Sequence, residues 1–198
     1  MFTALVVSAC QTTPKNYESV EQGTWQTKVL VQDKVKKKSF IVNVEFKAQA
    51  HRGLRMDVFS PLGTHEASLV LNGDKVDYIL VDQRQAFSGL ATDQSLKPVI
   101  SVPVHPKVLE SVLFDHPIEK SGWTCDRDPE GFLNECRNGE SNLVVRWRDR
   151  MAHRKNIFID HPAAEVQIRV LEFDSKIENP KKAFSLSVPS SFKRHKIN

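Results

Sequence analysis

The sequence of 198 residues has no uninterrupted apolar run close to the ~20 residues that a helix needs to span a bilayer. It also lacks the basic stripe with interspersed aromatic residues that is typical of nucleic-acid-binding proteins. Hydrophobic and charged residues make up 40% and 26% of the chain, which is ordinary for a globular protein. The length fits one domain with a sizeable core. We therefore expect a single globular domain that does not bind nucleic acid.

Catalytic motifs are missing as well. None of the seven histidines lies in an H-E-x-x-H or other close ligand spacing, and there is no G-x-S-x-G motif or glycine-rich phosphate loop. His105, His116 and His161 each precede a proline at an expected element boundary, where a role in a turn is favoured. Asp126 and Asp128 are expected to be solvated in a hairpin. The sequence therefore predicts a protein that is not an enzyme and that has no cofactor or metal.

The pattern that is present is an alternation of apolar and polar residues with a period of two. Along 40–47, for example, every second residue is Phe or Val, which is typical of a strand with one apolar and one wet face. Turn signals such as Asn72-Gly73 separate such runs. The predicted fold class is mainly β, a curved and largely antiparallel sheet of about eleven strands at 24–31, 40–47, 54–59, 65–71, 75–81, 122–127, 132–137, 142–148, 155–160, 164–173 and 184–188.

The alternation stops between residues 89 and 117, where several prolines interrupt the chain. Residues 106–114 read as a short amphipathic helix that begins at a proline and carries an apolar stripe of Val108, Leu109, Val112 and Leu113. This helix would cover the concave, apolar face of the sheet. Eleven phenylalanines against two tyrosines favour an oily interior. The sequence leaves open whether side chains fill that interior or leave a cavity.

The turn between the third and fourth expected strands contains an unusual leucine. Ser60-Pro61-Leu62-Gly63 has turn chemistry, because proline presets φ and glycine accepts a positive φ. A polar residue is usual between Pro61 and Gly63, but Leu62 occupies that place. Either Leu62 folds back onto the domain as a local plug, or it is exposed and has a function at the hairpin tip.

The N-terminus predicts a lipid anchor. Residues 2–9 are mostly apolar and end in small residues directly before Cys10, so that Val7-Ser8-Ala9-Cys10 resembles a bacterial lipobox. We interpret 1–9 as a truncated lipoprotein signal peptide and 10–23 as an acylated cysteine with its polar tether. No basic residue precedes the apolar run, which a start codon assigned too far downstream would explain. The alternative is an incidental cysteine in a frayed terminus.

The other two cysteines flank a turn signal, Pro129-Glu130-Gly131. Folding the chain back at this turn places Cys125 opposite Cys136, close enough for a cross-strand disulfide. A metal site is the alternative, but the intervening residues offer no third ligand other than acidic side chains. We therefore expect the disulfide.

Two clusters of basic residues stand out in a chain with a net charge of +4. One covers residues 34–38, and the other lies in the C-terminal tail at 191–198, which follows the expected main domain at 24–190. Both clusters are interpreted as a solvated loop and tail, or as sites of weak attraction to anionic lipid.

Taken together, these features resemble the LolB family of outer-membrane lipoprotein receptors. The resemblance covers residues 24–173, and it rests on the lipobox, the strand meander, the Pro61-Leu62-Gly63 hairpin and the Val102-Pro103-Val104 entry to the helix. It implies an incomplete barrel whose helical lid encloses a cavity for the acyl chains of lipoproteins. Candidate lining residues are Phe40, Val42, Phe46, Met56, Leu109 and Leu113.

The same resemblance implies a location and partners. It places a monomer, anchored by lipid, on the periplasmic side of the outer membrane of a Gram-negative bacterium. A periplasmic carrier of the LolA type would deliver the lipoprotein, and the hairpin leucine, Leu62, would enter the membrane. Two features depart from the family, namely the short stretch at 16–23 and the Cys125–Cys136 pair. They leave open a lipid-binding relative with other cargo, or an anchored module that binds envelope proteins.

Overall fold

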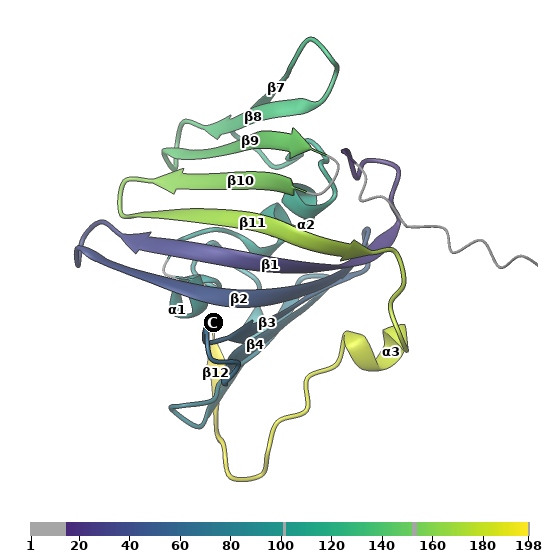
Figure 1. Ribbon diagram of the computed structural model, residues 1–198. Coiled ribbons are helices and arrows are strands. Elements are labelled where there is room, and N and C mark those ends of the chain that lie inside the picture. The colour runs from purple at the N-terminus through teal and green to yellow at the C-terminus, as the bar shows by residue number, and fades with distance from the viewer. Residues whose placement is uncertain (1–14, 101, 152–153, 198) are drawn as a thin grey trace, which may run out of the picture.

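The computed structural model describes residues 15–100, 102–151 and 154–197. These residues form one curved sheet of twelve strands in the order β12-β6-β5-β4-β3-β2-β1-β11-β10-β9-β8-β7 (Figure 1). The strands are β1 (Gln22–Asp33), β2 (Lys38–Gln49), β3 (Gly53–Phe59), β4 (His65–Asn72), β5 (Lys75–Leu80), β6 (Gln85–Leu90), β7 (Trp123–Arg127), β8 (Leu133–Asn138), β9 (Leu143–Met151), β10 (Arg154–His161), β11 (Ala164–Asp174) and β12 (Lys193–Ile197).

The predicted fold class is confirmed, because the described residues form a mainly β, open and curved sheet with only short helices. Its topology is two antiparallel meanders, β1–β6 and β7–β11, joined side by side. β1 pairs with β2 on one edge and with β11 on the other. The sheet is therefore continuous, although a long connection separates β6 from β7.

The concave face of the sheet holds the main core. Alternate residues of each strand point into it, such as Val29 and Val31 of β1 and Val44 of β2, and all three are buried. Helices α1 (Lys97–Ile100) and α2 (Pro106–Leu113) lie behind the sheet in Figure 1, on this face, with α1 behind β1 and β2 and α2 behind β10 and β11. The helix predicted at 106–114 is thus present, and its apolar stripe is buried in the same core.

The C-terminal part differs from the sequence prediction. Residues 184–188 form no strand; instead α3 (Pro180–Ala183) and the chain after it cross the outer face of the sheet, where Phe184 packs near Val70. The residues predicted as a basic tail form β12, which pairs in parallel with β6. The alternation of β12 fits this pairing. His195 stacks on Phe87, whereas Arg194 and Lys196 on either side of it are exposed and keep this sheet edge charged.

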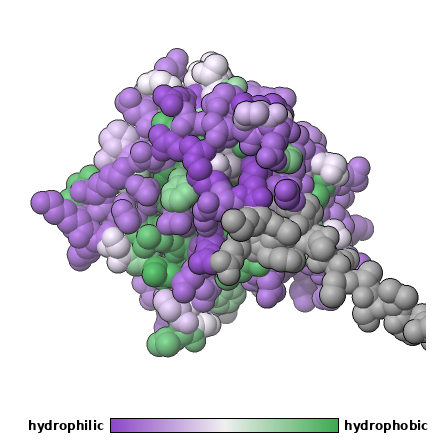
Figure 2. All heavy atoms as spheres, turned by 45° about the horizontal axis from the view of Figure 1, so that its top comes forward, coloured by the Kyte–Doolittle hydropathy of each residue, from purple (hydrophilic) through white to green (hydrophobic). Residues whose placement is uncertain are grey.

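No helix within the described residues is long and apolar enough to cross a membrane. Cys10 and the predicted signal peptide lie outside the described residues. The folded domain includes more than the predicted 24–190, since Tyr17 is fully buried in the core and β12 extends to Ile197. In Figure 2, one face of the molecule is mostly hydrophilic, with hydrophobic atoms reaching the surface in separate patches.

Candidate functional site

The concave face beneath α2 brings together five of the six residues predicted to line a cavity. These five are at most 5% exposed and belong to one hydrophobic cluster, which contains Val42, Phe46, Met56, Leu109 and Leu113. Side chains from two strands and the helix therefore fill the space between sheet and lid. The structure shows the site in a packed, closed arrangement.

Phe40 departs from the prediction. Its side chain is 40% exposed and is not part of the buried cluster. Phe40 lies opposite Val31 of β1, but β3 ends at Phe59, which pairs with Asn43. No strand therefore flanks Phe40 on its second side, and alternation alone could not reveal where the neighbouring strand stops.

Polar contacts hold the start and middle of α2. His105 caps the helix, with its Nδ1 accepting a hydrogen bond from the Lys107 backbone N–H at 3.2 Å. Its Nε2 lies 3.2 Å from the carbonyl oxygen of Ala91. Further along, the Glu110 carboxylate accepts a hydrogen bond of 2.7 Å from the backbone N–H of His51, in the turn between β2 and β3. These contacts tie the first half of the lid to the β2–β3 turn and to the residue after β6.

A buried ionic cluster holds the other end of α2. Asp115, which follows the C-cap residue Phe114, accepts hydrogen bonds from Lys155 Nζ at 2.7 and 2.8 Å and from Arg150 Nη1 at 3.0 Å. It also accepts one from the backbone N–H of Tyr17 at 3.0 Å. Asp115 adopts a positive φ of 56°, which is uncommon for a residue other than glycine. We call this group the Asp115 cluster; it joins the lid to β9, β10 and the N-terminal segment.

Burial changes the acid–base properties of the Asp115 cluster. Desolvation, only partly offset by the Asp115 carboxylate, lowers the pKa of Lys155 to about 8. The Lys155 ammonium also lies 4.0 Å from the centre of the Tyr17 ring, a cation–π contact. Burial, followed by the negative charge of Asp115, raises the pKa of Tyr17. The cluster was missed by the sequence reasoning, because its members are far apart in the chain and match no motif.

The hairpin tip between β3 and β4 displays Leu62. A tight turn forms it, with the Gly63 N–H donating to the Ser60 carbonyl at 2.9 Å and Gly63 at a φ of +84°. Leu62 is 95% exposed. The turn that Pro61 begins therefore holds an apolar side chain away from the domain, and Leu62 is not a plug in this structure.

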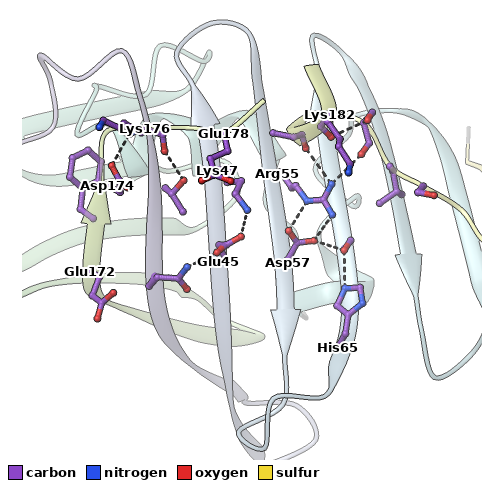
Figure 3. A pocket seen from close by; sticks show the side chains of 18 of the residues that line it. Glu45, Lys47, Arg55, Asp57, His65, Glu172, Asp174, Lys176, Glu178 and Lys182 are labelled. Atoms are coloured by element: carbon purple, nitrogen blue, oxygen red, sulfur yellow. Dashed lines mark hydrogen bonds and ion pairs between the residues drawn. The ribbon is translucent and has the colours of Figure 1, made fainter. Parts of the chain in front are cut away.

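A hollow of about 800 Å³ lies on the outer face of the sheet, between the strands and the segment that carries α3 (Figure 3). His65, Ser68 and Asp57 meet here, which raises the question of a catalytic triad. The Ser68 hydroxyl donates to Asp57 and lies 2.9 Å from His65 Nε2, while Asp57 also accepts from Arg55. In a triad the acid orients the histidine, not the serine. Ser68 is buried, so this network stabilises the face rather than supplying a nucleophile.

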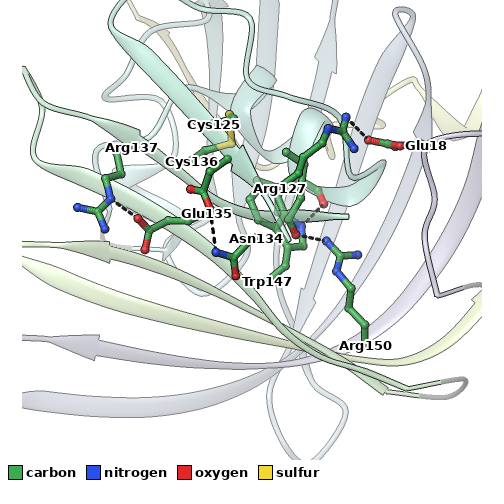
Figure 4. Close-up of a disulfide and its surroundings, with 12 residues drawn as sticks. Glu18, Cys125, Arg127, Asn134, Glu135, Cys136, Arg137, Trp147 and Arg150 are labelled. Atoms are coloured by element: carbon green, nitrogen blue, oxygen red, sulfur yellow. Dashed lines mark hydrogen bonds and ion pairs between the residues drawn. A yellow bond between two sulfur atoms is a disulfide. The ribbon is translucent and has the colours of Figure 1, made fainter. Parts of the chain in front are cut away.

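Cys125 and Cys136 are joined by a disulfide between the paired strands β7 and β8 (Figure 4). They lie directly opposite each other, as expected from a turn at residues 129–131. Across the described ranges, no group of three or more His, Cys, Asp or Glu side chains is placed to hold a metal ion. The disulfide fastens the outermost hairpin of the sheet.

Comparisons with known proteins give matches at the level of structure. A LolA superfamily protein from Nitrosomonas europaea aligns with a TM-score of 0.55 and 7% identity, over 86% of this chain and 94% of its own. The chain has a LolA-like fold. No family model matches the sequence, and no curated protein is significantly similar to it.

Two further structures align at a TM-score of 0.49. One is an uncharacterised conserved protein from Thermus thermophilus, with 12% identity over 92% of this chain and 95% of its own. The other is a putative outer membrane lipoprotein-sorting protein domain from Vibrio parahaemolyticus, with 6% identity over 82% and 91%.

Proposed function

We propose that this protein is a lipoprotein receptor of the bacterial outer membrane, anchored through acylated Cys10. Acyl chains of a lipoprotein, delivered by a periplasmic carrier of the LolA type, would bind between the concave face and α2. Leu62, on its hairpin tip, would then enter the membrane and assist insertion of the cargo. The LolA-like fold supports this proposal.

The observation that carries the proposal is the amphipathic helix α2, which closes an apolar concave face and whose polar contacts lie at its start, at its middle and beyond its C-terminal end. Its buried side chains make only apolar contacts, which acyl chains can replace at little cost because both are hydrocarbon. The polar contacts of Asp115 and Glu110 lie outside that apolar stripe. Entry of an acyl chain therefore requires α2 to move away from the sheet, and the Asp115 cluster resists this movement.

Native mass spectrometry tests acyl binding directly. The full-length Cys10→Ala protein, which carries no acyl chains of its own, is mixed with a diacylated lipopeptide. We expect a saturable one-to-one complex. Asp115→Asn should increase the fraction bound severalfold, because it weakens the ion pairs that hold α2 closed. Asp149→Asn is the matched control, since Asp149 also has a positive φ but is exposed and its carboxylate accepts a hydrogen bond from Asn156, not from a residue of α2 or of the Asp115 cluster.

Absence of any complex, in a protein whose circular dichroism and unfolding are normal, would contradict the proposal. The buried cluster under α2 would then be a permanent core. That packed arrangement favours the second candidate function, an anchored module that binds envelope proteins without holding lipid.

A further inference from the structure

Exposed apolar side chains gather at one end of the sheet. Of the six large hydrophobic residues that are exposed within the described part of the chain, four lie on the adjacent β1–β2 and β3–β4 hairpins, namely Val35, Phe40, Ile41 and Leu62. Leu90 lies at the far end of β6. Large apolar side chains exposed together indicate an interaction surface.

The two hairpins share this end because their strands pair. β2 continues for five residues beyond Asn43, the partner of the last residue of β3, so β2 extends roughly 16 Å beyond the end of β3 at the usual rise per residue. A hydrogen bond of 3.5 Å from Asn43 Nδ2 to the Ser60 carbonyl connects β2 to the turn that carries Leu62. In Figure 1 the β1–β2 hairpin lies at the opposite side of the molecule from α3.

The projecting hairpin tip is held in place by hydrogen bonds. Asp33 Oδ1 accepts from the backbone N–H of Val35 at 3.0 Å and of Lys36 at 2.8 Å. The Lys34 N–H donates to the Ala163 carbonyl at 2.9 Å, which links the tip to the β10–β11 hairpin. Val35 is nevertheless 74% exposed. The turn therefore presents this side chain to the surroundings.

The same tip is strongly basic. Residues 33–38 contain four lysines and one aspartate, a net charge of +3. Lys34 pairs with Asp160, and Lys36 lies 3.9 Å from Asp33. Lys37 and Lys38 are exposed next to Val35 and Phe40. Apolar side chains on a tip surrounded by lysines match the interface of an anionic bilayer, where phosphate groups lie just outside the acyl region.

We propose that the β1–β2 hairpin tip, residues 33–41, is a second membrane-binding element that docks this end of the sheet on anionic lipid. The inference deepens the proposed function and rests on it, because that function holds the molecule near a membrane. Val35, Phe40 and Ile41 enter the boundary between head groups and acyl chains, beside Leu62. The lysines contact lipid phosphates. Two narrow tips do not form the broad, flat surface of about 800 Å² that a stable protein interface needs from each partner, so lipid is the assigned occupant.

Vesicle sedimentation tests this element apart from the acyl anchor. The full-length Cys10→Ala protein is mixed with vesicles of phosphatidylcholine alone or with 30% phosphatidylglycerol added. We expect binding to the anionic vesicles that weakens with salt. Lys37→Glu/Lys38→Glu should lower the partition coefficient at least about tenfold, and Val35→Ser should lower it severalfold. The matched controls are Lys181→Glu/Lys182→Glu on α3 and Leu90→Ser, which should leave it within twofold.

The outcomes separate this proposal from the receptor function. Equal losses in the hairpin and control variants would overturn it, as would absence of binding to anionic vesicles at low salt. Binding to polyglutamate but not to vesicles would point to an acidic protein partner and would also overturn it. Lipopeptide binding, measured on the same preparations by mass spectrometry, tests the receptor function independently. Vesicle binding without lipopeptide binding would contradict the receptor function and would leave the membrane-binding hairpin supported.

Discussion

At the scale of single residues, the most informative side chain is Leu62. An apolar side chain with 95% exposure loses about 1.5–3 kcal/mol that burial would recover. Proline before it and a glycine with positive φ after it fix the turn, so local geometry maintains this exposure. The domain does not gain stability from this exposure, which agrees with the membrane role that we propose for Leu62.

Leu62→Glu should impair delivery of bound lipoprotein to liposomes while changing the unfolding free energy by less than about 0.5 kcal/mol, because the side chain contacts little of the domain. Transfer of a labelled lipoprotein and chemical denaturation measure the two effects. Leu90→Glu is the control, being an exposed leucine at the other end of the sheet. Unchanged transfer would mean that the tip has no membrane role, and ready unfolding would mean that it supports the fold.

At the scale of elements, the β7–β8 hairpin and the helix α2 show two ways of fastening a peripheral piece to the sheet. β7 is an edge strand that pairs only with β8, and the disulfide joins the two strands covalently. Beside it, the carboxylate of Glu135 pairs with Arg137 and Arg146 (Figure 4 shows the first pair). α2 has no disulfide to the sheet and is held by packing, by its hydrogen bonds and by the Asp115 cluster, which is compatible with the movement that the proposed function requires.

Removal of the disulfide by Cys125→Ser/Cys136→Ser should lower the unfolding free energy by about 2–3 kcal/mol, because the unfolded chain regains the freedom of a short loop. Denaturation by urea measures the loss, with Thr124→Ser in the same strand as a control. Non-reducing peptide mapping of the unmodified protein should recover the linked pair. Two free thiols in material purified from the periplasm would contradict the assignment.

At the scale of the whole molecule, the Asp115 cluster connects the N-terminal segment, the lid and the second meander. Removing one partner from a buried ion pair is costly, since it leaves a charge without compensation. The group therefore couples closure of α2 to the stability of the domain. Lys155 makes the contribution of this cluster to the unfolding free energy depend on pH, which distinguishes the cluster from the exposed ion pairs.

Because of Lys155, the unfolding free energy should rise as the pH is raised from 8 to 10. In the folded protein Lys155 loses its proton at a pKa of about 8, whereas in the unfolded chain it does so near ~10.4. The unfolded state thus binds more protons in this window, so raising the pH favours folding. The raised pKa of Tyr17 acts in the opposite direction only above about pH 10, where the unfolded chain loses that proton first.

Denaturation of the wild type and of Lys155→Met at several pH values isolates this effect. The difference in unfolding free energy between the two proteins should grow by about 1–2 kcal/mol in favour of the wild type from pH 8 to pH 10. Lys28→Met, at an exposed position of β1, should show no such trend. A difference that stays constant with pH would show that burial does not lower the pKa of Lys155 in the folded protein.

Local patterns in the sequence were enough to predict ten of the twelve strands in the described part of the chain, all but β6 and β12, together with the turns at Gly63 and Gly73, the helix at 106–114 and the opposed cysteines. They placed Leu62 at a hairpin tip but left open whether it is exposed. Each depends on residues close together in the chain, through a period of two, a helical stripe or a turn residue. Tertiary structure alone decided the pairing of β1 with β11, the parallel addition of β12 to β6, the exposure of Phe40 and the Asp115 cluster. These features depend on which distant segments meet and where a neighbouring strand ends, and no local pattern contains that information. The filling of the concave face is of the same kind, because packing density is a property of all the facing side chains together.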